Sequence, residues 1–85
     1  MRLFKIGKLY QPTGATRISA FEDYNTIKAW ASGFAVIGTF TEIQGPFLVL
    51  KTRYVGGDFL QVLYEEKCLW IRAPYVNCEQ VSDIE

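Results

Sequence analysis

The residue types that most often perform acid–base or nucleophilic chemistry are scarce in this sequence. It contains no histidine, which removes the commonest general base near neutral pH and every Ser-His or Cys-His pairing. Its two cysteines, Cys68 and Cys78, have no neighbouring sequence feature that would activate a thiolate. Adjacent carboxylates occur at positions 22–23 and 65–66, where they are typical of solvated turns or helix caps. The sequence therefore predicts a protein that is not an enzyme.

Metal and cofactor sites are not indicated by the sequence either. Two cysteines without histidine fall short of the four ligands of a structural zinc site. The Gly-Gly-Asp sequence at 56–58 lacks the Gly-Lys-Ser/Thr sequence and the helix that follow in a phosphate loop, and it predicts a hairpin turn instead. We expect no metal and no cofactor. The two cysteines are expected to be free thiols in a reducing cytoplasm, with one bridge between them left open.

Aromatic and arginine side chains are the best candidates for a functional surface. The 85 residues include two Trp, five Tyr and six Phe, more than a small core easily buries. Several of them lie at predicted strand ends near an arginine, and such side chains are frequent at the centre of protein interfaces. The predicted partner-binding residues are Tyr10, Tyr54, Trp70, Arg72 and Tyr75.

Other aromatic residues are assigned to the core. Trp30 is expected to fill the core, whereas Trp70 fits the core and the surface equally well because its predicted face carries both Cys68 and Arg72. The phenylalanines expected in the core are Phe4, Phe34, Phe40, Phe47 and Phe59.

A nucleic-acid-binding surface is the alternative hypothesis, because small barrels often bind RNA or DNA through aromatic rings and basic grooves. The residues for such a patch are Lys5, Lys8, Lys51 and Arg53, with Tyr10 and Tyr54. The patch requires the first strand to lie beside the end of the strand at 46–54. The formal net charge of zero and the isoelectric point of about 6.2 count against it, since nucleic-acid-binding domains are usually basic. Ordinary solubilising lysines are the simpler interpretation.

The two halves of the chain differ in charge. Residues 1–55 carry seven Lys/Arg and three acids, whereas residues 56–85 carry two Lys/Arg and six acids. Such a bipolar surface would suit docking to a protein partner, a second copy of the chain or a larger assembly better than wrapping a polyanion. If strands from both halves alternate in space, the separation disappears.

Residues 45–76 predict the centre of the fold. Three apolar strands are expected at 46–54, 59–64 and 68–72, joined by turns at 56–58 and 65–67. The second turn contains no glycine, so the sequence leaves its length open.

The remaining chain predicts four further strands and one helix. The strands are expected at 3–10, 16–21, 34–43 and 77–81, followed by a frayed tail at 82–85. The short helix is expected at Asn25–Ser32, with Asp23 or Asn25 as its cap and Gly33 at its end. Its apolar face comprises Ile27, Trp30, Ala31 and Phe34.

This order of elements resembles the SH3-like small barrel. Leu9-Tyr10 stands where such domains have Leu-Tyr in the first strand, and Pro74-Tyr75-Val76 matches the end of their Pro-x-x-Tyr-Val turn. Arg72 replaces the first proline of that turn, and Asp58-Phe59-Leu60 replaces the paired tryptophans. The acidic long loop is missing too, so binding of a proline-rich peptide is not expected.

The chain is also similar to short SH3-like proteins of bacteria and tailed phages, in the strands at 46–50 and 69–71 and the Gly-Asp at 57–58. The resemblance implies a mainly β fold over residues 1–85: an SH3-like small barrel of about five to six antiparallel strands, with one short helix in the long excursion after the first strand. The missing catalytic residues, the surplus of aromatic side chains and the uneven charge predict a protein-interaction module, with a phage-encoded accessory or host-interacting role as one form. The sequence predicts no signal peptide and no membrane span, and we therefore expect a cytoplasmic location.

Overall fold

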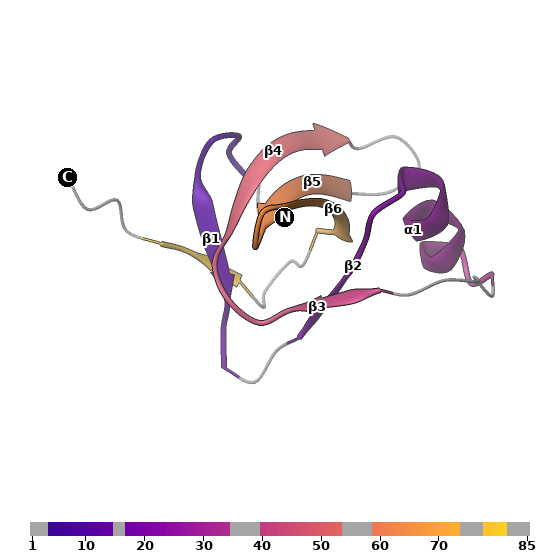
Figure 1. Cartoon of the computed structure of the whole chain (residues 1–85), viewed down its shortest axis with the longest axis horizontal. Coiled ribbons are helices and arrows are strands. Elements are labelled where there is room, and N and C mark those ends of the chain that lie inside the picture. Colours follow the sequence, from indigo (N-terminus) through magenta and orange to yellow (C-terminus); the bar gives the residue numbers. More distant parts are fainter. Residues whose placement is uncertain (1–3, 15–16, 35–39, 54–58, 74–77, 82–85) are drawn as a thin grey trace.

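A single curled sheet and one helix make up the computed structural model of the chain, which describes residues 4–14, 17–34, 40–53, 59–73 and 78–81 (Figure 1). The elements are β1 (Leu9–Pro12), β2 (Ile18–Phe21), α1 (Tyr24–Ala31), β3 (Thr41–Ile43), β4 (Phe47–Arg53), β5 (Phe59–Tyr64), β6 (Lys67–Arg72) and β7 (Cys78–Gln80). All strand pairs among these elements are antiparallel, and the sheet curls into a half-barrel. The predicted fold class is confirmed, with seven strands rather than five to six.

The predicted three-stranded meander forms the middle of the sheet. Its alternating pattern separates two faces, as expected for half-buried strands. Val49, Val62 and Leu69 are cross-strand neighbours on the inner face and are fully buried. Leu63 and Cys68 are paired on the outer face, where both are exposed. The meander therefore presents one face to the barrel core and the other to the outside.

The remaining strands extend the meander on both sides, giving the order β3-β2-β6-β5-β4-β1-β7. β1 is shorter than predicted, because residues 5–8 form a turn in which Gly7 has a φ of +84°. The Gly7 N–H donates to the Val49 carbonyl oxygen, and the Lys8 carbonyl oxygen accepts from the Val49 N–H, so this turn is fixed against β4. Pro12 is the last residue of β1 and pairs with Cys78.

The helix begins one residue earlier than predicted and is capped by Asp23. The Asp23 Oδ2 atom accepts hydrogen bonds from the Thr26 N–H and hydroxyl, each at 3.1 Å. Gly33 follows the helix with a φ of +89°, a conformation that glycine adopts at little cost, and its N–H donates to the Trp30 carbonyl oxygen. The choice of Asp23 over Asn25 resolves the alternative that the sequence left open.

Two groups of buried side chains hold the fold together. The barrel core lies inside the curled sheet and comprises Phe4, Tyr10, Ile18, Ala20, Ile43, Phe47, Val49, Leu60, Val62, Leu69, Ile71, Ala73 and Cys78. A second group, which we call the helix cluster, comprises Phe21, Ile27 and Phe59, packed against Tyr24, Ala31 and Trp70. Because Phe59 and Phe21 are next to inward-facing Leu60 and Ala20, they point to the opposite face of the sheet. Helix α1 therefore packs on the outer face, at one end of the half-barrel (Figure 1).

The turn between β5 and β6 contains only two residues, because Tyr64 pairs directly with Lys67. Glu65 and Glu66 both have positive φ, 48° and 67°, the geometry of a type I′ hairpin that Asn-Gly adopts best. Each non-glycine residue in this conformation costs about 1–2 kcal/mol. We expect the double variant Glu65→Asn/Glu66→Gly to raise the free energy of unfolding by about 1 kcal/mol or more, measured by urea denaturation.

The control for the turn variant is Glu22→Asn, which removes an exposed carboxylate where φ is not positive. It is expected to change the stability little. A turn variant that is no more stable than the native protein would contradict the role of backbone strain at this turn.

Candidate functional site

Tyr10 lies in the barrel core, so its predicted place on a binding surface is wrong. Its side chain is 3% exposed, and its ring contacts Phe4 edge-on at 4.8 Å between centroids. Its hydroxyl oxygen accepts a 2.8 Å hydrogen bond from the Lys5 N–H. The physical reason is that β1 lies between β4 and β7, where the inward position of the strand is covered on both sides. Tyr10 therefore stabilises the fold and is left out of the site.

Trp70 and Arg72 are on the outer face of β6, as the alternation of the strand predicted. Trp70 is half-buried in the helix cluster, so it combines the core and surface interpretations that the sequence left open. Arg72 is exposed. The other two predicted partner-binding residues, Tyr54 and Tyr75, lie outside the described residues.

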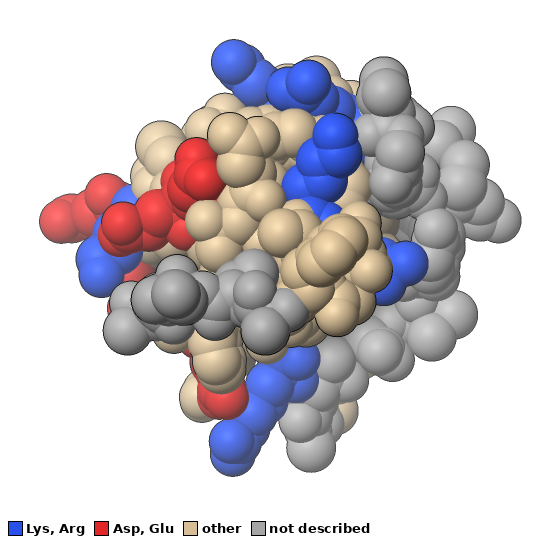
Figure 2. All heavy atoms as spheres, turned by 90° about the vertical axis from the view of Figure 1, so that its right-hand side faces the viewer, with Lys and Arg blue, Asp and Glu red and all other residues tan. Residues whose placement is uncertain are grey.

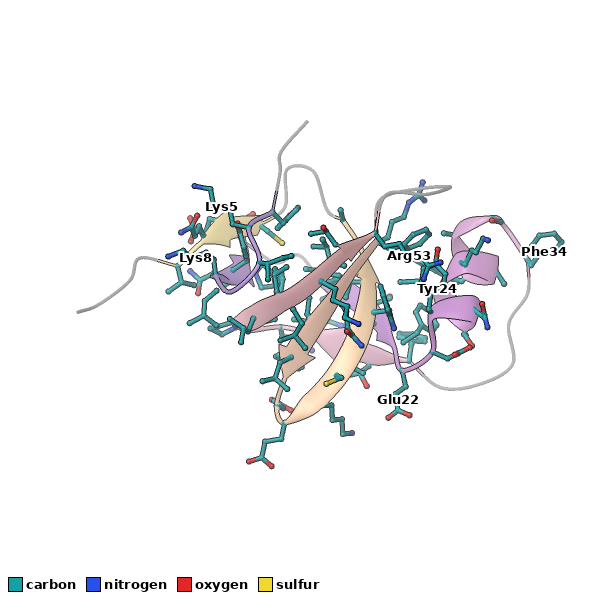
Figure 3. The ribbon with its side chains drawn as sticks, turned by 90° about the horizontal axis from the view of Figure 1, so that it is seen from above. Lys5, Lys8, Glu22, Tyr24, Phe34 and Arg53 are labelled. Carbon is teal, nitrogen blue, oxygen red and sulfur yellow. The ribbon has the colours of Figure 1, made fainter. Side chains whose placement is uncertain are left out.

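Three aromatic residues that were expected in the core are instead on the surface. Trp30 is 41% exposed, Phe40 is 53% exposed and Phe34 is 68% exposed. Helix α1 ends at Ala31, so Phe34 lies beyond its last turn and is seen at the outer side of the helix (Figure 3). A helix of eight residues packed on the outer face of a sheet is too short to bury the whole predicted apolar stripe. The predictions for Phe4, Phe47 and Phe59 are confirmed.

Trp30 and Phe40 both rest on Phe21, which is buried. The ring centroid of Phe21 lies 5.4 Å from that of Trp30 and 6.0 Å from that of Phe40. Phe21 is also the cross-strand neighbour of Trp70. These contacts order the two exposed rings in the free protein. The entropy cost of ordering them when a partner binds is therefore smaller.

Tyr24 is at the centre of the contacts on the other side of the helix. Its ring lies edge-on to Phe59 at 5.6 Å and tilted against Trp70 at 4.9 Å between centroids. The Arg53 guanidinium carbon lies 4.2 Å from the centre of the Tyr24 ring, within the range of a cation–π interaction. Figure 3 shows Arg53 and Tyr24 together beside α1. Tyr24 was not among the predicted site residues, although its spacing from Ile27 and Ala31 continues the helical apolar stripe.

Arg53 and Arg72 flank Phe59 on the outer face, because Phe59 is the direct cross-strand neighbour of both. Two strand spacings separate their backbones by about 10 Å. Both side chains are exposed, and within the described ranges neither forms an ion pair with a carboxylate. The outer face thus carries two arginines, one on each side of the buried Phe59. We name this set the arginine–aromatic surface: Tyr24, Trp30, Phe40, Arg53, Trp70 and Arg72.

The residues predicted for nucleic-acid binding do not form one patch. Lys5 and Lys8 lie at the end of the molecule opposite Arg53 (Figure 3). The reason is that the turn at 5–8 is fixed at Val49, whereas Arg53 ends the same strand four residues later. Lys51 is exposed between them on β4, Tyr10 is buried, and Tyr54 is outside the described residues.

The charges on the helix end of the molecule are unevenly arranged. Figure 2 shows Lys and Arg side chains around an uncharged area of this face, with the visible acidic side chains on its left half. Glu22 projects away from Arg53 and Tyr24 in Figure 3. The arginine–aromatic surface itself contains two arginines and no acidic residue, in a chain whose formal net charge is zero.

The described residues also bear on metal binding, disulfide formation and membrane spanning. The part of the chain that the structure describes contains no group of three or more His, Cys, Asp or Glu side chains able to hold a metal ion. Cys68 lies on the outer face and Cys78 in the barrel core, and the disulfide left open by the sequence is not formed between them. No helix within the described ranges has the length and apolar character required to cross a bilayer.

Comparisons with protein-family models, curated proteins and solved structures found no match to this chain.

Proposed function

We propose that the protein is a non-enzymatic interaction module that binds a protein partner through the arginine–aromatic surface. The observation that carries the proposal is the exposure of Trp30 and Phe40 on the buried ring of Phe21. The Arg53–Tyr24 pair lies on the other side of the helix and is linked to Phe21 through Trp70. Tryptophan, tyrosine and arginine are the residues most enriched among those that dominate interface energies. Exposing large rings to water has no benefit for folding, so a partner that covers them is the simplest reason for their arrangement.

Cellular context is part of the same proposal. Two cysteines that form no disulfide are consistent with the reducing cytoplasm, where we place the protein. A phage-encoded accessory or host-interacting role remains one form of the proposed function. Nucleic-acid binding remains the alternative, weakened by the separation of Lys5 and Lys8 from Arg53.

The proposal predicts that Trp30→Ser/Phe40→Ser abolishes most of the binding. Peptides would first be selected from a displayed library of random twelve-residue sequences against the native protein. We expect the double variant to bind the selected peptides at least 30-fold more weakly, since the loss of one central interface ring, worth about 2 kcal/mol, already corresponds to about that factor. Both tryptophans of the chain, Trp30 and Trp70, belong to the surface, so their two indole N–H signals in NMR spectra report binding there directly.

The matched control is Ile6→Ser/Leu9→Ser, which removes two exposed apolar side chains in and just after the turn at 5–8. This control should retain native affinity. Equal loss of binding in the two double variants, or selected peptides that leave both indole signals unchanged, would refute the proposed surface. Far-UV circular dichroism would establish that each variant is folded.

A further inference from the structure

We infer that the partner segment is acidic and that its carboxylates bind to Arg53 and Arg72 across Phe59. This inference rests on the proposed function and names the chemistry of the partner. It arises from the register of the meander, which places both arginines on the outer face as neighbours of one buried aromatic residue. The backbones of the two arginines are about 10 Å apart. Their guanidinium groups can therefore donate hydrogen bonds to two carboxylates of an extended peptide, or both can bind one carboxylate.

Arg53 is already oriented before any partner arrives. Its guanidinium carbon lies 4.2 Å from the centre of the Tyr24 ring, and Tyr24 is held in turn by Phe59 and Trp70. Stacking on a ring face leaves the guanidinium N–H groups at its edges directed outward, where they can form paired hydrogen bonds to a carboxylate. A guanidinium that is held in this way loses less side-chain entropy on binding than a free one.

Among the described residues, no carboxylate forms an ion pair with Arg53 or Arg72. The Asp23 carboxylate accepts hydrogen bonds from Thr26 at the start of α1, and Glu22 points away from Arg53 (Figure 3). The ion pair found among the described residues joins Arg17 to Glu42 instead. The positive charge at Arg53 and Arg72 is therefore available to a partner, and an acidic segment is the complementary one.

The same contacts favour an acidic peptide over a single-stranded nucleic acid. Base stacking needs an open ring face, whereas one face of Tyr24 is occupied by Arg53 and its ring is also packed against Trp70. A nucleic-acid backbone also needs a continuous row of cations, and Lys5 and Lys8 are at the far end of the molecule. Two separate arginines and exposed rings are better suited to a peptide in which an apolar side chain contacts the rings and neighbouring carboxylates bind the arginines.

The test uses the full chain, the random twelve-residue peptide library and a twelve-nucleotide oligo-dT as probes. We expect selected peptides that shift the Trp30 and Trp70 indole signals to be enriched in Asp and Glu. Arg53→Gln/Arg72→Gln should weaken their binding at least tenfold, and Lys5→Gln/Lys8→Gln, which removes the same charge at the far end, should change it less than twofold. Binding should also weaken as salt is raised from 50 to 500 mM.

Three results would overturn the inference in distinguishable ways. Peptides that shift the indole signals without acidic enrichment, or that bind the Arg53→Gln/Arg72→Gln variant normally, would overturn the acidic partner and leave the proposed function standing. Selection of no peptide that shifts the indole signals would overturn both. Tighter binding of oligo-dT than of the best peptide at the same indole signals would replace the acidic segment with nucleic acid.

Discussion

Replacing Phe59 with alanine is expected to lower the free energy of unfolding by about 3–5 kcal/mol. The side chain is 1% exposed and fills the helix cluster between β5 and α1, where Tyr24 packs edge-on against it. Its cross-strand neighbours, Arg53 and Arg72, are exposed and cannot fill the cavity left behind. For a domain of this size, such a loss is a large part of the total stability.

The measurement for Phe59→Ala is urea denaturation followed by tryptophan fluorescence. Trp70 packs against the helix cluster, and Trp30 contacts Phe21, which belongs to that cluster. Leu63→Ala is the control, since Leu63 lies on the same outer face of β5 but is 37% exposed. We expect the control to lose about 1 kcal/mol or less. Similar losses for the two variants would contradict the packing of α1 over Phe59.

Peptide binding should decrease with Phe59→Ala as well as stability. Tyr24 loses the ring on which it rests, and Arg53 is oriented by Tyr24. Binding is therefore expected to fall even at temperatures where the variant remains folded, as measured with the selected peptides. Unchanged affinity in the folded variant would show that Phe59 stabilises the fold without positioning the surface.

The second large effect is expected for Leu69→Ala, which removes a fully buried side chain from the barrel core. Leu69 is the cross-strand neighbour of Val62, which is also fully buried, and the expected loss is about 2–5 kcal/mol in the free energy of unfolding. Because Leu69 lies on the face of the sheet opposite α1, the variant should bind the selected peptides with native affinity while it is folded.

Cys68→Ala is the control for Leu69→Ala. Cys68 precedes Leu69 in β6 and is exposed on the outer face, so its replacement should change the stability by less than about 0.5 kcal/mol. Urea denaturation followed by far-UV circular dichroism would compare the two. A loss of peptide affinity in folded Leu69→Ala would show that packing of the barrel core affects binding at the arginine–aromatic surface.

Local sequence signals were sufficient for the central meander and the helix. The alternation of Phe59–Tyr64 gave both bounds of β5, because the strand is flanked by turn residues on each side. The helix was predicted one residue too late, and Gly33 marked its end because a residue with φ of +89° cannot continue a helix. The bounds of β5 and of the helix are set by residues close in the sequence, so the local sequence pattern is enough to predict them.

The candidate site was predicted only in part, because it depends on tertiary packing. Trp70 and Arg72 were found because alternation along β6 places them on the outer face. Trp30 and Phe40 were missed, since the pattern of a helix or a strand predicts which residues share a face but not how much of that face another element covers. Tyr10 was misplaced for the converse reason: the two strands that enclose β1 come from distant parts of the sequence.

The position of β1 between β4 and β7 has a consequence for how the chain folds during synthesis. Both strands that pair with β1 are made later than β1, and one of them, β7, follows all the other strands that the structure describes. The hairpins β4–β5 and β5–β6 close over short loops, whereas the pairing of Tyr10 with Gln80 closes a very long one. The meander is therefore expected to form early in folding, whereas the pairing of β1 with β7, and with it the full burial of Tyr10, is expected later.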